Sequence, residues 1–485
     1  MKRNKHNLSH NNLLTCNMGV AVPFNKVEVL PGDSVQAHVS AFMRVTPLIT
    51  PIMHSVTARI HHWFCPYRIL WPEWEQFITG GPDGMDASVF PTLTTTVAEG
   101  DPLDYMGIPP ATASPVEISA LPTRAYNKII NEWYRDADLV TERLEDDETM
   151  ANIAWEKDYF TSARPWPQKG PEVTLPLGTT APVKGLGQTT QTYGGPETIF
   201  ETGASGSRVY AATKGLETNS FMEQDPANAG FPGIFADLTN ATAASVTDLR
   251  TALAIQRYQE ARSRYGSRYT EYLRYLGVKS SDARLQRPEF LGGGKTQLQF
   301  SEVLNTTSAL DDPASSLDDL GRMGGHGIAG MRSNRFRRFF EEHGVIISIL
   351  SIRPKTMYTQ GIHRSWLRRV KEDFWQKELE HIGQQDVKGK EIYADAITET
   401  FGYQDRYHDY RTMPNRISAE MRSILDFWHM GRSFATEPVL NASFVECDPT
   451  HRVFAEQTQH SMWCMLNTHM VARRLVSRSA APRIY

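Results

Sequence analysis

Residues 33–45 read DSVQAHVSAFMRV, and apolar and polar residues alternate along almost the whole of this segment. Every second residue from Val35 onward is apolar, whereas the residues between them are polar apart from Phe42. A period of two is typical of a strand that buries one face. A Pro-Gly pair just before the segment and a proline just after it mark its ends. The sequence therefore predicts a long, half-buried strand close to the N-terminus.

Strand patterns recur at widely separated positions. Residues 56–60 alternate in the same way and run on into HHWFCPY at 61–67, whereas residues 345–352 are apolar almost throughout, which predicts a strand buried on both faces. Residues 439–444 alternate again and predict a late strand. Strands that come from distant parts of a chain and pair with one another indicate a sandwich or Greek-key barrel rather than a βα repeat.

Long excursions separate these strands. Helical spacing of apolar residues predicts helices at 71–78, 126–133, 245–276 (interrupted at Gly266) and 366–374. Segments rich in Gly, Pro, Thr or Asp predict loops at 80–122 and 292–329. From 171 to 244 charges are sparse and apolar periodicity is lost, but aromatic residues are scattered through the segment. We interpret this last segment as an exposed, folded insertion, since loops of such length are functional or disordered.

Length and composition limit the class of protein. A chain of 485 residues is expected to form two to four domains, or one large β domain with long insertions. Its 51 Lys and Arg against 55 Asp and Glu give a net charge of −4, which is unlike a free nucleic-acid-binding domain. Contact with nucleic acid would then have to be local, through one face or a tail.

The four cysteines and the apolar runs give further limits. Cys16, Cys65, Cys447 and Cys464 include no C-x-x-C pair, so they predict reduced, buried thiols rather than a zinc site or a disulfide framework. Reduced thiols are consistent with synthesis in the cytoplasm. The N-terminus lacks the apolar region of a signal peptide, and the longest apolar run, 345–352, is too short to cross a bilayer.

Both ends of the chain are basic and free of acid. The first dozen residues contain Lys2, Arg3 and Lys5, and the residues after Glu456 contain Arg473, Arg474, Arg478 and Arg483. Such ends suit contacts with phosphate groups, although solvated ends have the same composition.

Residues 155–170, WEKDYFTSARPWPQKG, place four aromatic residues around one cation, Arg164. Two prolines bracket Trp166 and hold this piece extended. Aromatic faces beside a guanidinium predict a stacked, partly desolvated junction. The segment holds no nucleophile and no pair of groups arranged to move a proton, so we interpret it as a rigid corner that pins two layers together.

The motifs that would indicate catalysis or a cofactor fail on spacing or context. Gly294-Lys295-Thr296 lacks the upstream glycine of a P-loop, and the glycines at 325, 327 and 330 do not follow a predicted strand. His61 and His62 lie on a predicted strand and so point to opposite faces. The acidic cluster at 142–148 is typical of a solvated face, and a cation site between subunits is the alternative. The sequence thus predicts no enzyme, no cofactor and no defined metal site.

Two segments combine tyrosine with arginine. The helix predicted at 245–276 carries Tyr258 and Arg262, and residues 403–416 carry Tyr403, Tyr407 and Arg411. Such segments could stack single-stranded bases or bind phosphate. Acidic residues dilute the charge in both, so we favour contacts between subunits, where Tyr and Arg are enriched.

Several of these stretches together resemble a known family. DYFTS and RPWPQKG within 158–170 closely resemble the motif of major capsid proteins of the Microviridae, small tailless single-stranded DNA phages, with the gokushovirus-like branch nearest. Four other stretches agree in the same order: LTCNMGVAVPFNKVEVLPGDSV at 14–35, VTARIHHWFCPYRILWPEWEQFITGG at 56–81, SDARLQRPEFLGGG at 281–294 and FGYQDRYHDYRTMPNRISAEMR at 401–422. The main part without a match is about 176–244.

The resemblance implies a mainly β fold, an eight-stranded antiparallel viral jelly roll with long loop and helical insertions. The expected parts are an N-terminal arm with the first strands (1–67), an insertion with helices and the corner (68–170), an exposed insertion forming a threefold protrusion (171–247), a helix and loop insertion (248–343), and the remaining strands with a helical insertion and the basic tail (344–485). The implied function is self-assembly into a T=1 icosahedral shell of 60 subunits, with pentameric and threefold contacts, around a circular single-stranded DNA genome.

The expected partners are other copies of the chain, the DNA, a small basic DNA-binding phage protein and a host cell-surface receptor, in a virion assembled in the bacterial cytoplasm. Candidates for facing DNA are Lys2, Arg3, Lys5, Arg473, Arg474 and Arg478. Candidates for subunit contacts are Arg164, Trp166, Tyr258, Arg262, Tyr403, Tyr407 and Arg411, and candidates for meeting the host surface are Tyr193, Tyr210, Phe221 and Phe231. The alternative from another class is a carbohydrate-binding or polysaccharide-cleaving β protein, for which no acid/base pair can be nominated.

Overall fold

The computed structural model describes residues 3–81, 85–110, 114–171, 173, 183–184, 198–200, 207–209, 235–236, 246–265, 274, 286–306, 321 and 323–478. The chain divides into two compact units. The first unit comprises Met1–Pro167 and Arg262–Tyr485, and the second comprises Gln168–Ala261. Within the second unit, β8 (Val183–Lys184) pairs with β11 (Phe235–Ala236) and β9 (Thr198–Phe200) pairs with β10 (Ser207–Val209), both antiparallel.

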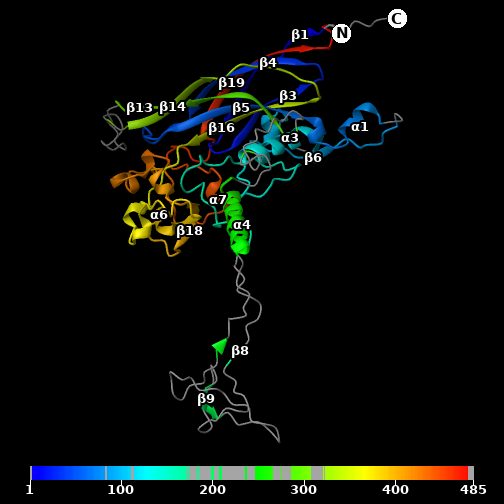
Figure 1. The fold of residues 1–485 in the computed structure, drawn as a ribbon. Coiled ribbons are helices and arrows are strands. Elements are labelled where there is room, and N and C mark those ends of the chain that lie inside the picture. Colours follow the sequence, from blue (N-terminus) through cyan, green and yellow to red (C-terminus); the bar gives the residue numbers. More distant parts are fainter. Residues whose placement is uncertain are drawn as a thin grey trace. The chain divides into compact units, whose positions relative to one another are not determined.

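Two antiparallel sheets that lie one over the other form the centre of the first unit (Figure 1). The larger sheet contains β1 (Asn4–Asn7), β2 (His10–Cys16), β4 (Ser34–Val45), β13 (Gln299–Leu304), β14 (Met323–Arg332), β15 (Phe336–Phe339) and β19 (Met462–Arg474). The smaller sheet has the order β12 (Glu289–Gln297), β5 (Val56–Pro66), β16 (Gly344–Pro354) and β3 (Ala21–Val29). This arrangement confirms the predicted mainly β, antiparallel architecture.

The strands do not divide into two sheets of four. In the described residues the larger sheet has seven strands and the smaller has four. Two of the three additional strands arise because two positions in the sheet are each occupied by a pair of shorter strands: β1 and β2 are successive pieces along β19, and β14 and β15 are successive pieces along β4.

The apolar faces of the two sheets meet in one core. The strand predicted at 33–45 is β4, and its apolar residues are buried as the alternation indicated. Val39 and Met43 pack in the same cluster as Ile60 of β5 and Leu350 of β16. Burial of these side chains is the main favourable term that holds the sheets together.

The smaller sheet is also covered on its other face. α3 (Leu121–Ile129) and the π-helical turn η2 (Ile130–Tyr134) pack on it, and the hydroxyl of Tyr126 donates a hydrogen bond of 2.8 Å to the carbonyl of Ala21. Covering on both sides explains why β16 is buried along nearly its whole length, as its apolar run predicted. In the part of the chain that the structure describes, no such layer of helices covers the larger sheet along β4 and β19.

The prediction of a loop at 292–329 is wrong, because this segment contributes residues to three strands, β12, β13 and β14. Its glycines serve close packing between strands. A Cβ atom on Gly293 would lie 2.3 Å from the carbonyl oxygen of Ile60, and one on Gly327 would lie 2.7 Å from a methyl of Val45. Of the three glycines that resembled a dinucleotide motif, Gly325 and Gly327 therefore lie on a strand where the neighbours leave no room for a side chain, whereas nothing lies within 4 Å of a Cβ atom on Gly330.

The strand predicted at 439–444 is also wrong. The segment forms the short helix α7 (Ala442–Val445), because the side chain of Asn441 accepts a hydrogen bond from the backbone of Phe444 and caps the first turn. The late strand is instead β19, whose alternation of buried and exposed residues continues over 13 residues.

The predicted helices are confirmed in part. α1 (Trp74–Thr79), α3 and α4 (Val246–Tyr265) lie where the apolar spacing placed them, and α4 is described up to the residue before Gly266. The helix predicted at 366–374 is reduced to two 3₁₀ turns, η6 (Arg364–Trp366) and η7 (Lys371–Asp373), and Trp366 is 81% exposed. The loop predicted at 80–122 contains α2 (Pro102–Tyr105) and a hairpin of β6 (Thr92–Thr95) and β7 (Val116–Ser119).

The late insertion, 355–445, packs on the corner at 155–170. It contains β17 (Gln384–Lys388), α6 (Gly389–Ile392), β18 (Thr400–Asp405) and the turns η8 (His408–Tyr410), η9 (Ala419–Arg422) and η10 (Asp426–Trp428). Phe160 packs in one cluster with Tyr358 and Phe401 of this insertion. All four cysteines are free and buried, which confirms the predicted state of the thiols.

Candidate functional site

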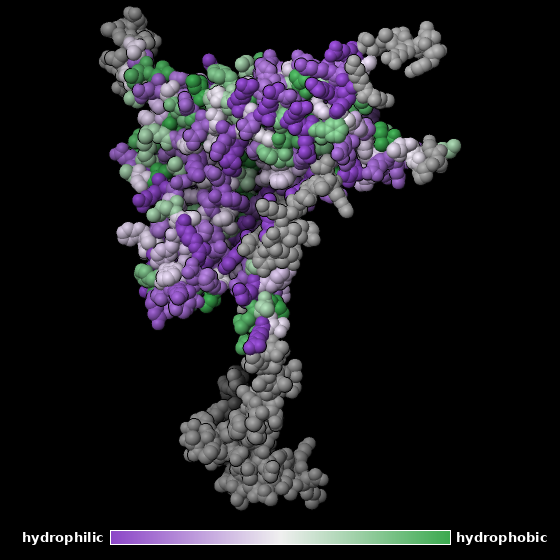
Figure 2. Space-filling view, turned by 45° about the horizontal axis from the view of Figure 1, so that its top comes forward, coloured by the Kyte–Doolittle hydropathy of each residue, from purple (hydrophilic) through white to green (hydrophobic). Residues whose placement is uncertain are grey.

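The outer face of the larger sheet is the most distinctive surface of the first unit. Residues of β4 and β19 alternate between the core and this face, so His38, Arg44, His469 and Arg473 point outward. Figure 2, which brings this side of the molecule forward, shows hydrophilic side chains gathered over it with hydrophobic ones between them. Below, this surface is called the sheet face.

Both basic ends of the chain meet on the sheet face. β1 pairs antiparallel with the end of β19, which places Lys5 opposite Arg473. Arg3 lies nearby, where its guanidinium donates hydrogen bonds of 3.0 Å to the carbonyl of Gly32 and to the hydroxyl of Ser34. Cations from positions nearly 470 residues apart in the sequence therefore form one cluster.

The charge of the strands is one-sided. The seven strands of the larger sheet contain one acidic residue, Glu302, and the following Lys and Arg residues: Lys5, Arg44, Arg332, Arg337, Arg338, Arg473 and Arg474. The two arginines of β15, Arg337 and Arg338, are both exposed. A chain of net charge −4 thus concentrates positive charge on one sheet.

Not every cation of this group is available to a ligand. The guanidinium of Arg474 lies 2.9 Å from the fully buried carboxylate of Asp33, so we assign it a structural role. The guanidinium of Arg338 pairs with Glu289 at 2.7 Å. Arg3, Lys5, Arg337 and Arg473 make no ion pair with any residue that the structure describes, and Arg478 is exposed at the end of the described chain.

Two histidines lie next to these cations, towards the middle of the sheet. The rings of His38 and His469 stack with centroids 4.7 Å apart, and Arg332 Nη2 lies 2.9 Å from His38 Nε2. Partial burial, followed by the nearby Arg332 guanidinium, lowers the pKa of His38. This histidine is therefore neutral at pH 7 and can accept the hydrogen bond from Arg332.

The far end of the sheet face is aromatic. Phe42, Trp463 and Met465 are 39 to 48% exposed, and the guanidinium of Arg44 lies 5.4 Å from the ring centroid of Phe42. These side chains line a cavity of about 630 Å³ together with Tyr105 of α2. Aromatic faces beside cations can stack single-stranded bases while the cations bind the phosphates.

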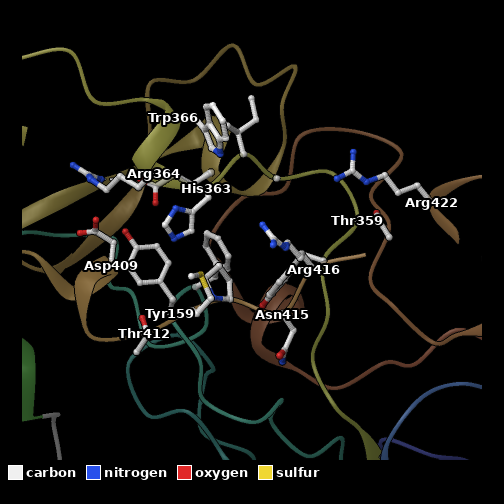
Figure 3. A pocket seen from close by; sticks show the side chains of 17 residues that line it. Tyr159, Thr359, His363, Arg364, Trp366, Asp409, Thr412, Asn415, Arg416 and Arg422 are labelled. Atoms are coloured by element: carbon white, nitrogen blue, oxygen red, sulfur yellow. Dashed lines mark hydrogen bonds and ion pairs between the residues drawn. The ribbon is translucent and has the colours of Figure 1, made fainter. Parts of the chain in front are cut away.

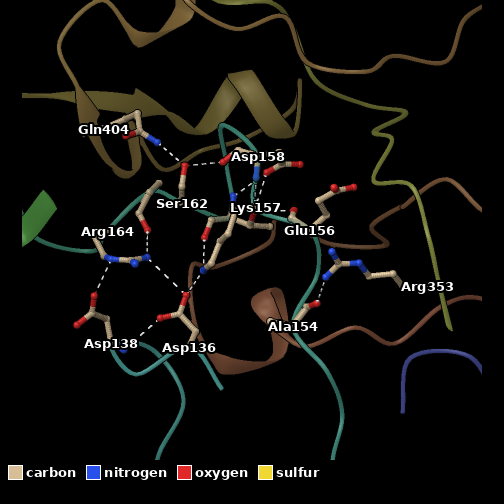
Figure 4. A network of polar contacts seen from close by, with 12 residues as sticks. Asp136, Asp138, Ala154, Glu156, Lys157, Asp158, Ser162, Arg164, Arg353 and Gln404 are labelled. Carbon is tan, nitrogen blue, oxygen red and sulfur yellow. Dashed lines mark hydrogen bonds and ion pairs between the residues drawn. The ribbon is translucent and has the colours of Figure 1, made fainter. Parts of the chain in front are cut away.

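The corner at 155–170 has a different construction from the predicted stack. Among the described residues, no aromatic ring lies against the Arg164 guanidinium. Its Nε pairs with Asp138 at 2.9 Å, and Nη1 lies 3.6 Å from Asp136, both carboxylates being 3% exposed (Figure 4). The cation that does stack is Arg432, whose guanidinium lies 4.3 Å from the ring centroid of Phe444 and 5.1 Å from that of Trp155.

The corner nevertheless pins two parts of the chain together. Arg164 exchanges two backbone hydrogen bonds with Tyr403 of β18, of 2.9 and 2.7 Å. Asp158 accepts hydrogen bonds from the backbone of Thr161 and from the hydroxyl of Tyr358, each of 2.8 Å. The sequence indicated the rigid corner but not the two aspartates that hold its cation.

The candidates for subunit contacts differ in exposure. Tyr407 is 3% exposed, and its hydroxyl donates to the carbonyl of Glu372, so its burial argues against a contact through this side chain. Arg411 is exposed and pairs with Glu380 at 3.3 Å, and Tyr258 is 44% exposed. Trp166 and Tyr403 are half-buried, and Arg262 lies near the end of α4. Contacts through these residues stay predictions.

Other sequence predictions fall outside the described residues or concern ligands. Lys2 and the host-surface candidates Tyr193, Tyr210, Phe221 and Phe231 lie outside the described residues. Among the residues that were described, no group of three or more His, Cys, Asp or Glu side chains could hold a metal ion. In the same residues, no helix is both long and apolar enough to cross a bilayer.

Comparison of the sequence with known protein families and proteins identifies the family of this chain. The family model described as capsid protein (F protein) matches residues 1–481. The chain belongs to this capsid protein family. The capsid protein VP1 of Bdellovibrio phage phiMH2K is 33% identical over 479 residues, which cover 92% of this chain and 88% of the relative. VP1 of Chlamydia phage 1 is 29% identical, covering 96% and 92%, and VP1 of Spiroplasma virus 4 is 30% identical, covering 92% and 88%.

These matches confirm the predicted relationship to capsid proteins of the Microviridae and the function of a capsid subunit in the virion. The carbohydrate-binding alternative finds no support in them. A capsid subunit needs surfaces that contact other copies of the chain, and the function of the sheet face is a separate question.

Proposed function

We propose that 60 copies of this capsid protein form a T=1 icosahedral shell around a circular single-stranded DNA genome, and that the sheet face is directed at the DNA. Its role is structural rather than catalytic. The observation that carries the proposal is the convergence of both basic ends on a face whose strands contain a single acidic residue.

The two ends of the sheet face suit the two parts of a single strand. Lys5, Arg337 and Arg473 offer exposed charges for phosphates, whereas Phe42 and Trp463 offer ring surfaces for bases. The opposite sheet is buried under α3 and cannot serve in this way. A small basic phage protein could share the neutralisation of the genome.

Charge neutralisation tests this orientation. In particles carrying Lys5→Gln, Arg337→Gln and Arg473→Gln together, DNA should be released at lower salt than in the parent, because each lost phosphate contact reduces the salt dependence of binding. The matched control is Lys355→Gln with Lys371→Gln, two exposed cations outside the larger sheet. DNA release at unchanged salt in the triple variant, measured by nuclease sensitivity of intact particles, would refute the orientation.

We further propose that the insertion at 171–247 meets the host surface. Its support is compositional: it has few charges, scattered aromatic residues and none of the family motifs. Deleting about residues 180–240 should leave particles that assemble in the host cytoplasm but do not adsorb to cells. Loss of assembly in the deleted protein would show that the insertion is structural instead.

A further inference from the structure

A second hollow lies in the late insertion, away from the sheet face. It has a volume of about 480 Å³, and the apolar part of its wall comes from Phe160, Tyr358, Ile362, Met413 and Pro414. Trp366 and Met413 at this hollow are 81% and 75% exposed. Large apolar side chains left open to water beside a cavity are typical of a surface that another molecule covers.

The same hollow carries uncompensated cations. Figure 3 shows Arg416 and His363 at the hollow, with Arg422 at one side of it. Neither Arg416 nor Arg422 makes an ion pair within the part of the chain that the structure describes, and Nε of Arg422 donates only to the carbonyl of Ile417. By contrast, the two carboxylates that line the hollow are already paired with arginines. Glu391 pairs with Arg364, and Asp409 pairs with Arg368. The occupant should therefore combine an apolar side chain with a carboxylate.

The chain offers a segment of this kind on another surface. Residues 142–148 form an acidic loop, ERLEDDE, in which Leu144 is 79% exposed and is followed by Glu145. Glu145 is exposed and forms no salt bridge among the described residues. The loop thus presents one apolar side chain next to one unpaired carboxylate.

The acidic loop is held rigidly on α3. The side-chain amide of Asn127 donates hydrogen bonds of 2.8 and 2.7 Å to the carbonyls of Glu145 and Asp147, and Arg124 pairs with Asp146 at 2.7 Å. Asn131 exchanges two further hydrogen bonds with the backbone of Arg143. A loop fixed in advance loses little conformational entropy when it docks.

We propose that the acidic loop of one copy docks into this hollow of a neighbouring copy, with Leu144 in the apolar part and Glu145 paired with Arg416. Within one chain the two cannot meet, since α3, which holds the loop, and α6, which lines the hollow, lie well apart in the same unit (Figure 1). A contact between unlike surfaces of identical copies repeats from copy to copy, and it closes into a ring when the rotation between copies allows. The inference rests on the proposed assembly and names the contact that drives it.

Charge exchange tests the pairing. Glu145→Arg and Arg416→Glu should each lower the yield of closed particles at least about tenfold, because each places like charges together at the contact. Combining the two should restore most of the yield, as a direct pair requires. Val89→Ser, which removes a side chain that is 83% exposed, is the control and should assemble normally. Single variants that assemble like the parent, or a combination without recovery, would overturn the proposal.

A disulfide trap tests the contact itself and separates it from the proposed function. Because the four native cysteines are buried, Leu144→Cys in one copy and Met413→Cys in another would be the reactive thiols when the two proteins are mixed and assembled under oxidising conditions. A covalent dimer on a non-reducing gel is expected, and Val89→Cys in place of Leu144→Cys should give none. Closed shells without the dimer would overturn the docking alone, whereas a parent protein that forms no shells would overturn the proposed function.

Discussion

Replacing Arg164 by Met tests whether the corner is held by ion pairs or by stacking. The guanidinium faces two carboxylates that are each 3% exposed, and the substitution keeps most of the side-chain volume while removing the charge. Removing one partner from a buried pair costs about 3–5 kcal/mol, because the remaining charge stays in a poorly solvated place. Asp136 retains Lys157, so the lower end, about 3 kcal/mol, is expected for the free energy of unfolding.

The assay is urea unfolding of the unassembled capsid protein, followed by tryptophan fluorescence. Arg411→Met is the matched control, since this arginine pairs with Glu380 at a surface where both side chains are at least 31% exposed. Such a pair contributes about 0–1 kcal/mol, so the control should unfold close to the parent. Equal effects of the two substitutions would refute the assignment of Arg164 to a buried pair.

The difference in the free energy of unfolding between the parent and Arg164→Met should also depend on pH, which gives an independent check. Burial raises the pKa of Asp136, but the Lys157 and Arg164 cations outweigh it and lower the pKa below its ordinary value. The unfolded chain therefore binds the proton first as pH falls, and the stability from this carboxylate is lost as pH drops through the folded pKa. Because Arg164→Met removes one of the two cations, its stability difference from the parent should shrink below about pH 4.

Three further outcomes are expected. Gly293→Ala should destabilise the protein by about 3 kcal/mol in urea, because its Cβ would meet a backbone carbonyl that cannot move away, whereas Gly330→Ala, with nothing within 4 Å, should have little effect. Burial lowers the pKa of His62 to about 4, so as pH falls the unfolded chain protonates this histidine before the folded chain does. The free energy of unfolding should therefore fall as pH drops from about 6.5 to 4, and in unfolding curves measured across this range His62→Gln should reduce that fall. Asn441→Ala should cost about 1 kcal/mol through loss of the cap on α7, and an unchanged unfolding curve would contradict the capping.

The sequence by itself determined the β class, several of its strands and the family. The alternation in β4 and the apolar run in β16 were readable because the burial of a strand repeats every two residues or fills both faces, and no distant partner is needed to see either pattern. The glycine-rich strands were not readable in this way. Gly293 and Gly327 are glycines because of atoms on β5 and β4, and that reason exists only once the strands are side by side.

The functional surfaces depended on the tertiary structure even more strongly. The sequence showed two basic ends, but only the pairing of β1 with β19 joins them, and only the covering of the smaller sheet by α3 leaves the other sheet as the open face. The sequence likewise showed Arg164 among aromatic residues, whereas Asp136 and Asp138, which bind it, come from a separate turn. Local patterns report which face of an element is buried, but charge compensation is set by neighbours that the fold brings from elsewhere in the chain.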